Sequence, residues 1–217
     1  MIEIDKVPKI NNFIHQLFYK NKKKFNFFSN IETNTFNKFK SHTIEKPIYV
    51  CGLARSGTTL LTHLLNYFKN LGSAQYKDMP FINTPLFWNS VSNLYYGKKK
   101  DFKRFHGDSM NINLNSPDSF EEIYWLNKDH NFEITYKNFI KKILILRRSN
   151  RYLAKNNNLI SRIEELEKLF VNPKIIVIYR DPIKTVESLT KVNQKIYESN
   201  DKKKISKYLK YIGHNEF

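Results

Sequence analysis

The stretch PIYVCGLARSGTTLL at residues 47–61 decides the fold. It begins with a short apolar run, 47–51, which predicts a buried β-strand. Gly52 and Gly57 bound a tight turn, and from Thr58 onward leucines recur at helical spacing. A glycine-rich turn between a buried strand and a helix forms an anion site, because its N–H groups point inward and the helix dipole adds partial positive charge. We therefore expect a phosphate or a sulfate-like group to bind here.

The cation of this turn lies inside the loop. In a nucleoside triphosphatase a lysine follows the second glycine and reaches the β- and γ-phosphates, whereas here Thr58 occupies that position and Arg55 supplies the charge. A guanidinium has a fork of fixed donors that suits one phosphate or sulfate-like group. The loop therefore argues against Mg²⁺-assisted triphosphate hydrolysis. The alternative interpretation is an ordinary strand–helix turn that happens to be rich in glycine.

A second basic residue follows another predicted strand. Residues 175–182 read IIVIYRDP, and Ser188 lies about two turns into the helix that Pro182 starts. The carboxyl ends of strands in open α/β sheets border the crevice where ligands bind. Arg180 and Ser188 are therefore candidates for holding a second phosphate. A surface pair of Arg180 with Asp181 is the alternative interpretation.

Strands alternate with helices along the rest of the chain, which predicts an α/β domain with a mainly parallel sheet. Besides 47–51, we expect strands at 72–76, just before Lys155, and at 174–179. Helices are expected from Thr58 and at 87–96, 116–125, 136–148, 160–170 and 182–198. Residues 1–45 are amphipathic in pieces and are interpreted as an N-terminal helical extension that packs on a domain formed by 46–217.

The composition limits the class of protein. The chain has 217 residues with 37 Lys and Arg against 20 Asp and Glu, a net charge of +17. This charge is spread along the chain, whereas nucleic-acid binders usually concentrate it, so it favours a small polyanionic ligand. A single cysteine excludes an intrachain disulfide, and we expect no metal site. The absence of a signal sequence and of a long apolar run predicts a cytoplasmic location.

The two motifs together resemble those of sulfotransferases. GLARSGTTLL at 52–61 resembles their 5′-phosphosulfate loop in its arginine-bearing form, and YRDP at 179–182 with Ser188 is similar to their 3′-phosphate motif. The resemblance implies a three-layer P-loop-type α/β domain with a central, mainly parallel sheet flanked by helices. It also implies sulfuryl transfer from 3′-phosphoadenosine 5′-phosphosulfate (PAPS) to a hydroxyl or amine, without a metal. The acceptor class (small molecule, carbohydrate, lipid or peptide) and the oligomeric state stay open.

The resemblance also implies roles for individual residues. The 5′-phosphosulfate would be held by Arg55, Ser56, Gly57, Thr58 and Thr59, and the 3′-phosphate by Arg180 and Ser188. Lys155 would lie beside the sulfuryl group and offset the charge that builds on its oxygens.

The proton of the acceptor needs a base. Asp78, which follows the second predicted strand, and His106, whose imidazole suits this task near neutral pH, are the candidates. Glu121 and Glu122 are interpreted as a capping or positioning pair in the first turns of a helix. Sulfotransferases usually continue beyond the 3′-phosphate helix with a basic, glycine-containing segment, and we expect this chain to be truncated before it.

Two other functions compete with this one. The first is a P-loop kinase that transfers phosphoryl groups, with Asp181 as a metal-binding carboxylate, and it predicts a magnesium requirement. The second is a non-enzymatic basic module that binds nucleic acid, and it predicts steeply salt-dependent binding to any DNA or RNA.

Overall fold

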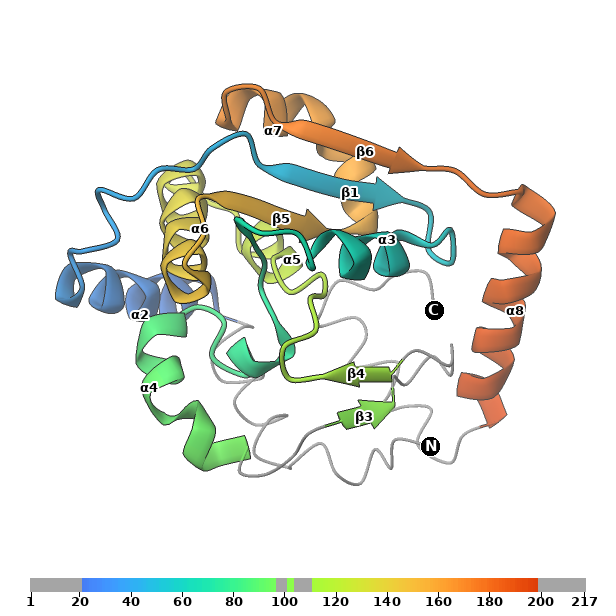
Figure 1. Ribbon diagram of the computed structural model, residues 1–217, viewed down its shortest axis with the longest axis horizontal. Helices are drawn as coiled ribbons and strands as arrows, with labels where there is room; N and C mark the ends of the chain where they lie inside the picture. Colours follow the sequence, from blue (N-terminus) through green and yellow to red (C-terminus); the bar gives the residue numbers. More distant parts are fainter. Residues whose placement is uncertain (1–20, 97–100, 104–110, 199–217) are drawn as a thin grey trace.

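The computed structural model of the protein describes residues 21–96, 101–103 and 111–198. Within them the main sheet has four parallel strands in the order β2-β5-β1-β6 (Figure 1). These strands are β1 Ile48–Gly52, β2 Leu71–Gly72, β5 Arg151–Lys155 and β6 Lys174–Ile178. A separate antiparallel pair, β3 Asp101–Lys103 with β4 Asn111–Asn113, was not predicted from the sequence.

Helices connect and cover the strands. They are α2 Lys22–Thr35, α3 Thr58–Leu65, α4 Pro85–Tyr96, α5 Glu122–Leu126, α6 Phe132–Arg147, α7 Ile163–Leu169 and α8 Pro182–Glu198, with 3₁₀ turns η3 Tyr76–Asp78 and η4 Asn157–Arg162. None of the described helices is long and apolar enough to cross a membrane. The predicted α/β order is therefore confirmed, with helices between successive parallel strands.

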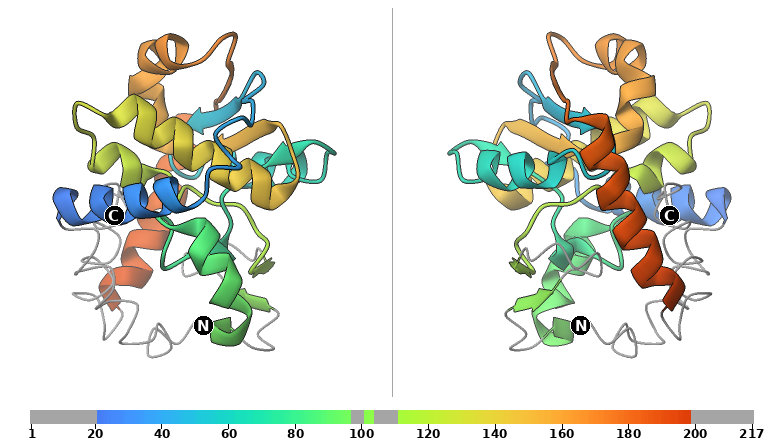
Figure 2. Two further views of the ribbon diagram at one scale, coloured as in Figure 1. Left: turned by 90° about the vertical axis from the view of Figure 1, so that its left-hand side faces the viewer. Right: turned by 90° about the vertical axis from the view of Figure 1, so that its right-hand side faces the viewer.

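Strand β1 is buried on both faces, and its side chains alternate between two apolar clusters. Ile48 and Val50 pack on one side with Leu61 and Leu65 of α3. On the other side, Tyr49 and Cys51 belong to a larger core, to which α5, α6 and α7 also contribute. Figure 2 shows α3 on one side of the strands and α5 and α6 on the other. The expected three layers are therefore present.

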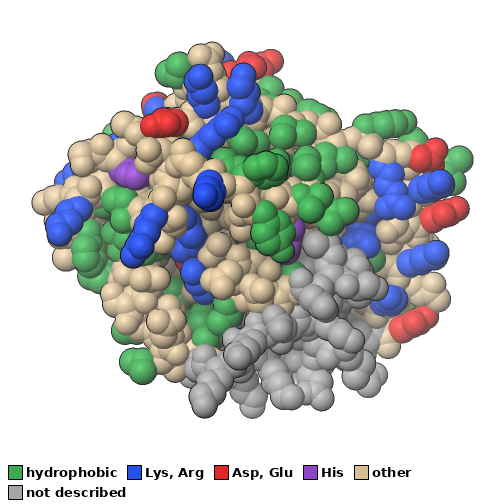
Figure 3. Space-filling view, viewed as in Figure 1, with side chains coloured by type: hydrophobic (Ala, Val, Ile, Leu, Met, Phe, Trp, Pro, Cys, Tyr) green, Lys and Arg blue, Asp and Glu red, His purple; other side chains and the backbone are tan. Residues whose placement is uncertain are grey.

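Helix α3 is shorter and more exposed than its leucine pattern predicts. It ends at Leu65. Leu61 and Leu65 point into the core, whereas Leu60, Leu64 and Phe68 are 54%, 53% and 65% exposed. The space-filling view shows apolar side chains gathered over this part of the face (Figure 3).

The segment after β2 departs from the prediction. The strand ends at Gly72 because the chain then pairs with residues 114–118 instead of continuing the sheet. Tyr76 N–H donates to the Ser116 carbonyl at 3.2 Å, and Gln75 forms an antiparallel bridge with Pro117. A helix expected over 116–125 was therefore wrong in its first turns, since α5 begins only at Glu122.

Helix α2 packs into the same core. Phe25 is fully buried in the large cluster. Glu32 and Lys142 of α6 form an ion pair of 3.0 Å with both side chains at 0% exposure. Glu32 also accepts a hydrogen bond of 2.7 Å from the Phe87 N–H at the start of α4. One buried carboxylate thus links three helices.

A second buried carboxyl group lies between α5 and the sheet. Tyr136 and Tyr152 donate hydrogen bonds of 2.9 and 3.2 Å to Glu121 Oε2. Burial raises the pKa of Glu121 to about 8, with Glu122 adding to the rise and the two tyrosines and Arg162 opposing it. Glu121 is therefore part of the core and does not cap the helix.

We expect Lys142→Ala to lower the free energy of unfolding by about 3–5 kcal/mol, because it leaves the Glu32 carboxylate buried without its cation. Lys137→Ala is the matched control, because Lys137 makes an exposed i,i+4 pair of 2.6 Å with Glu133 on the same helix. Its loss should cost no more than about 1 kcal/mol. Urea unfolding followed by circular dichroism measures both, and equal losses at the two positions would contradict the assignment.

The pKa of Glu121 predicts how stability depends on pH. The carboxyl ionises at about 4.5 when exposed in the unfolded chain and at about 8 in the fold, so folding binds a proton between these values. The contribution of Glu121 to stability is therefore lost as pH rises through this window. In Glu121→Gln the side chain stays neutral, so its stability relative to wild type should rise from pH 5 to pH 8. A difference that stays constant across this range, in urea melts at several pH values, would refute the shift.

Candidate functional site

The glycine-rich turn lies at the carboxyl edge of the sheet. In Figure 1 the arrowheads of β1, β5 and β6 all point toward α3 and α8. At Gly52 φ is +149°, and a Cβ there would lie 2.5 Å from the carbonyl oxygen of Ile178 in β6. Gly57 has φ of +105° and is the N-cap of α3, so no side chain at the N-cap position accepts a hydrogen bond from the first N–H groups of this helix. The two glycines thus serve a close strand approach and a left-handed turn, respectively.

Three residues predicted from two distant motifs meet at this turn. Arg55 Nε donates a hydrogen bond of 3.0 Å to the Ser188 Oγ on α8. The Arg180 guanidinium, just after β6, donates one of 2.9 Å to the carbonyl oxygen of Arg55. Arg55 itself has φ of +69°, a left-handed conformation that is uncommon outside glycine. Both guanidinium groups and the Ser188 hydroxyl therefore border one place.

The remaining loop residues are arranged around the N-terminus of α3. Ser56 Oγ is buried and has no hydrogen-bond partner within the described part of the chain. Thr58 is 3% exposed, and its hydroxyl donates to Asn157 Oδ1 at 3.3 Å, which ties the loop to the end of β5. Thr59 is half-buried beside it, and Gly57 is exposed. A buried hydroxyl and an uncapped helix start fit an incoming anion.

Lys155 lies at the same edge. It is the last residue of β5 and pairs in register with Val50 of β1. Its side chain is 4% exposed, and Nζ lies 3.4 Å from Asp118 Oδ1. The strand register thus brings Lys155 close to the turn that follows β1.

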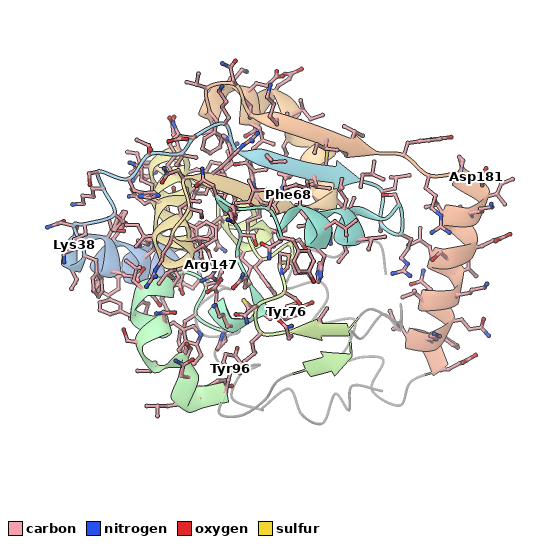
Figure 4. The ribbon with its side chains drawn as sticks, in the orientation of Figure 1. Lys38, Phe68, Tyr76, Tyr96, Arg147 and Asp181 are labelled. Carbon is pink, nitrogen blue, oxygen red and sulfur yellow. The ribbon has the colours of Figure 1, made fainter. Side chains whose placement is uncertain are left out.

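Asp78 has surroundings that give it a role in the fold. It is 3% exposed in η3 and accepts a hydrogen bond of 2.7 Å from the Gln75 N–H. The same oxygen is paired with Arg147 at the end of α6, which also donates to the Ser73 carbonyl (Figure 4). These surroundings lend no support to Asp78 as the base, which stays a prediction. The other candidate, His106, lies outside the described residues.

The two glutamates at the start of α5, interpreted from the sequence as a capping or positioning pair, make different contacts. Glu122 accepts two hydrogen bonds, of 2.7 and 2.9 Å, from Arg162 of η4. It also accepts one from the Asn156 amide, next to Lys155. Glu122 therefore fixes the segment that follows β5, while Glu121 lies in the core.

Asp181 is used as a helix cap. Its Oδ1 accepts a hydrogen bond of 2.9 Å from the Lys184 N–H at the start of α8, where Figure 4 labels it. Residues 21–96, 101–103 and 111–198 contain no group of three His, Cys, Asp or Glu side chains placed to hold a metal ion. The geometry therefore gives no particular support to Asp181 as a metal ligand.

Two residues at this edge were not singled out from the sequence. Asp118 contacts Lys155, and the Tyr76 hydroxyl donates a hydrogen bond of 2.5 Å to Asp118 Oδ2. Only the pairing of 114–118 with 74–77 brings these side chains together.

Comparison with solved structures places the fold among known ones. The fold is similar to the crystal structure of sulfotransferase STF1 from Mycobacterium tuberculosis, with a TM-score of 0.56 and 11% identity over 84% of this chain and 59% of that chain. It is also similar to STF9 from Mycobacterium avium, with a TM-score of 0.54 and 15% identity over 80% of this chain and 53% of the other. The chain thus spans little more than half the length of these enzymes.

Sequence comparison identifies the family directly. No curated protein sequence matches the chain significantly. The sequence profile of the sulfotransferase family, however, matches residues 47–213, which include the glycine-rich turn, Lys155, Arg180 and Ser188. The chain therefore belongs to the sulfotransferase family.

Proposed function

We propose that this protein transfers a sulfuryl group from PAPS to a hydroxyl or amine acceptor. The proposal rests mainly on one observation. Arg55 is hydrogen-bonded to both Ser188 and Arg180, although more than a hundred residues separate it from them in the sequence. A donor with anionic groups at both its 5′ and 3′ positions needs two cationic sites at a fixed separation. Neighbouring arginines from two strand ends supply such a pair.

In this proposal the turn holds the 5′-phosphosulfate. The N-terminus of α3 and the Arg55 guanidinium carry positive charge, and the buried Ser56 hydroxyl offers a further hydrogen bond. Arg180 and Ser188 hold the 3′-phosphate, which distinguishes this donor from ATP. Donor binding would shift the Arg55 guanidinium from Ser188 toward the ligand, because the hydroxyl and the ligand compete for the same donor group.

The chemical step follows from these charges. The acceptor atom attacks sulfur in line, the bond from sulfur to the bridging phosphate oxygen breaks, and adenosine 3′,5′-bisphosphate leaves with the electron pair. Lys155 Nζ offsets the charge that develops on the sulfuryl and bridging oxygens, and the loop amides stabilise the leaving phosphate. These groups are held in place before the reaction, so the step as proposed needs no metal. The acceptor and a cytoplasmic location stay predictions.

The kinase alternative gains less from the geometry. Thr58 occupies the position of the nucleotide-binding lysine and is directed to Asn157. Calorimetric titration with adenosine 3′,5′-bisphosphate and with ATP, without and with Mg²⁺, separates the two functions. The proposed function requires tighter binding of the bisphosphate, independent of Mg²⁺, and preference for Mg²⁺-ATP would overturn it.

We expect Arg55→Ala and Arg180→Ala each to weaken binding of adenosine 3′,5′-bisphosphate by about 1.5–3 kcal/mol, the scale of a charge-assisted hydrogen bond. Arg151→Ala is the matched control, because Arg151 begins β5 at the opposite edge of the sheet and donates to the Lys46 carbonyl at 2.8 Å. Calorimetry should give wild-type affinity for the control. Unchanged affinity in both site variants would show that the donor binds elsewhere.

The 3′-phosphate assignment has its own test. Adenosine 5′-phosphate should bind wild type more weakly than the bisphosphate, whereas Arg180→Ala/Ser188→Ala should barely distinguish the two ligands. The two losses are non-additive if these side chains contact the phosphate that is removed. Simple additivity in the same titrations would mean that Arg180 and Ser188 act only through the position of the loop.

A further inference from the structure

Asp118 lies where two other polar side chains of the carboxyl edge converge. Its Oδ1 is 3.4 Å from Lys155 Nζ, and its Oδ2 accepts the 2.5 Å hydrogen bond from the Tyr76 hydroxyl. Its side chain is 9% exposed, whereas that of Asp78 is 3% exposed. Lys155 precedes Asn157 by two residues, and Asn157 Oδ1 accepts a hydrogen bond from the Thr58 hydroxyl of the glycine-rich turn. Asp118 thus contacts the end of β5, next to the segment that is bonded to this turn.

The backbone holds Asp118 in this place. Its N–H donates to the Ala74 carbonyl at 3.4 Å, and next to this contact 114–117 pairs with 75–77. The Ser119 N–H donates to Oδ1 at 2.8 Å, which limits rotation of the carboxylate. The position of Asp118 is therefore set by the backbone that carries it and by hydrogen bonds to the carboxylate.

Side chains of helix α4 hold the backbone at Tyr76, the residue that donates to Asp118. Trp88 Nε1 donates to the Lys77 carbonyl at 2.8 Å, and the Tyr96 hydroxyl donates to the Met79 carbonyl, with the Tyr76 carbonyl 3.3 Å away as a second acceptor. The Tyr76 ring also packs edge-on against Phe120 at 4.9 Å between ring centroids. Figure 4 shows Tyr76 beside the segment that leads from β4 toward α5, which carries Asp118.

We propose that Asp118 is the catalytic base that accepts the acceptor's proton, with Tyr76 as its positioning residue. This inference rests on the proposed function. A base must lie near the cation that stabilises the transferring sulfuryl group, because the attacking atom bonds to sulfur and loses its proton in the same step. Asp118 borders Lys155, whereas Asp78 is paired with Arg147 at the end of α6.

The acceptor O–H or N–H gives its proton to an Asp118 oxygen while its lone pair forms the new bond to sulfur. The bond between sulfur and the bridging oxygen breaks, and adenosine 3′,5′-bisphosphate leaves with that electron pair. The protonated carboxyl then returns its proton to water. The Tyr76 hydroxyl keeps the other oxygen in place throughout.

The test uses water as the acceptor, since the natural acceptor is not needed for it. Release of sulfate from ³⁵S-labelled PAPS is followed across pH for wild type and for Asp118→Asn. We expect the variant to be slower by about 10²–10³, the scale of general base help, and to lose the acid limb of the pH–rate profile. Formate should restore part of the rate in Asp118→Ala, and Tyr76→Phe should lose only a few-fold.

The matched control is Asp129→Asn. Asp129 has a similar, intermediate exposure, but it lies between α5 and α6, where it accepts from Asn26 and the Asn131 N–H. The Asp129→Asn variant should hydrolyse PAPS at the wild-type rate. Calorimetry with adenosine 3′,5′-bisphosphate, together with urea melts, checks that each variant folds and binds the leaving nucleotide.

The outcomes separate the two proposals. Intact nucleotide binding with the predicted loss of rate supports Asp118 as the base. If Asp118→Asn binds the nucleotide, hydrolyses PAPS at the wild-type rate and keeps the wild-type pH profile, Asp118 is not the base, and the sulfotransferase proposal stays in place. The same conclusion follows if the wild type binds the nucleotide but never hydrolyses PAPS. Failure of wild type to bind the bisphosphate overturns both.

Discussion

The contact between Gly52 and the Ile178 carbonyl oxygen determines how the rest of the site is built. It allows β1 to turn away from the sheet directly against β6, at the last of five residue pairs in register. The loop after β1 and the segment after β6 therefore emerge side by side. Any side chain at Gly52 would force the two strands apart and with them the two arginines that they carry. The packing of β1 against β6 therefore sets where the two arginines lie, and their charges act from the positions that this packing gives them.

Ion pairs with at least one buried partner hold helices and turns around the sheet. Lys142 with Glu32, Arg147 with Asp78 and Arg162 with Glu122 each join two elements that are distant in sequence. Most lysines of the described residues are exposed and contribute little to this framework. The charges that affect the stability of the fold are the desolvated, paired ones, because a buried cation that loses its partner has no water to take the partner's place.

The part of the site that the sequence predicted is the part with a local signal. A strand, a glycine turn and a helix start are adjacent along the chain, so Arg55 and Thr58 could be placed without knowing the fold. The arginine after β6 followed from the same rule about strand ends. Tertiary pairing decided the rest: Ser116 and Pro117 are typical of a helix start, but their segment pairs with residues 74–77.

Asp78 and Asp118 illustrate the same limit. Asp78 follows a strand, which favours a place at the ligand-binding edge, but Arg147, far along the chain, engages its carboxylate. No pattern in the neighbouring sequence predicts Arg147 as the partner of Asp78. No strand was predicted before Asp118, and it reaches the edge only because its segment is held against 74–77. The leucine stripe of α3 misled in a similar way, because only one side of that helix is covered in the described structure.

The left-handed backbone at Arg55 restricts which sequences this loop can adopt. Side chains with a Cβ are strained in this conformation, and asparagine, aspartate and glycine tolerate it best. Selection for folding alone would therefore favour those residues at position 55, whereas selection for anion binding favours arginine. A library randomised at this codon and sorted for expression should diverge from one sorted for ligand capture. Relatives in which this turn no longer binds an anion are expected to carry glycine, asparagine or aspartate at this position.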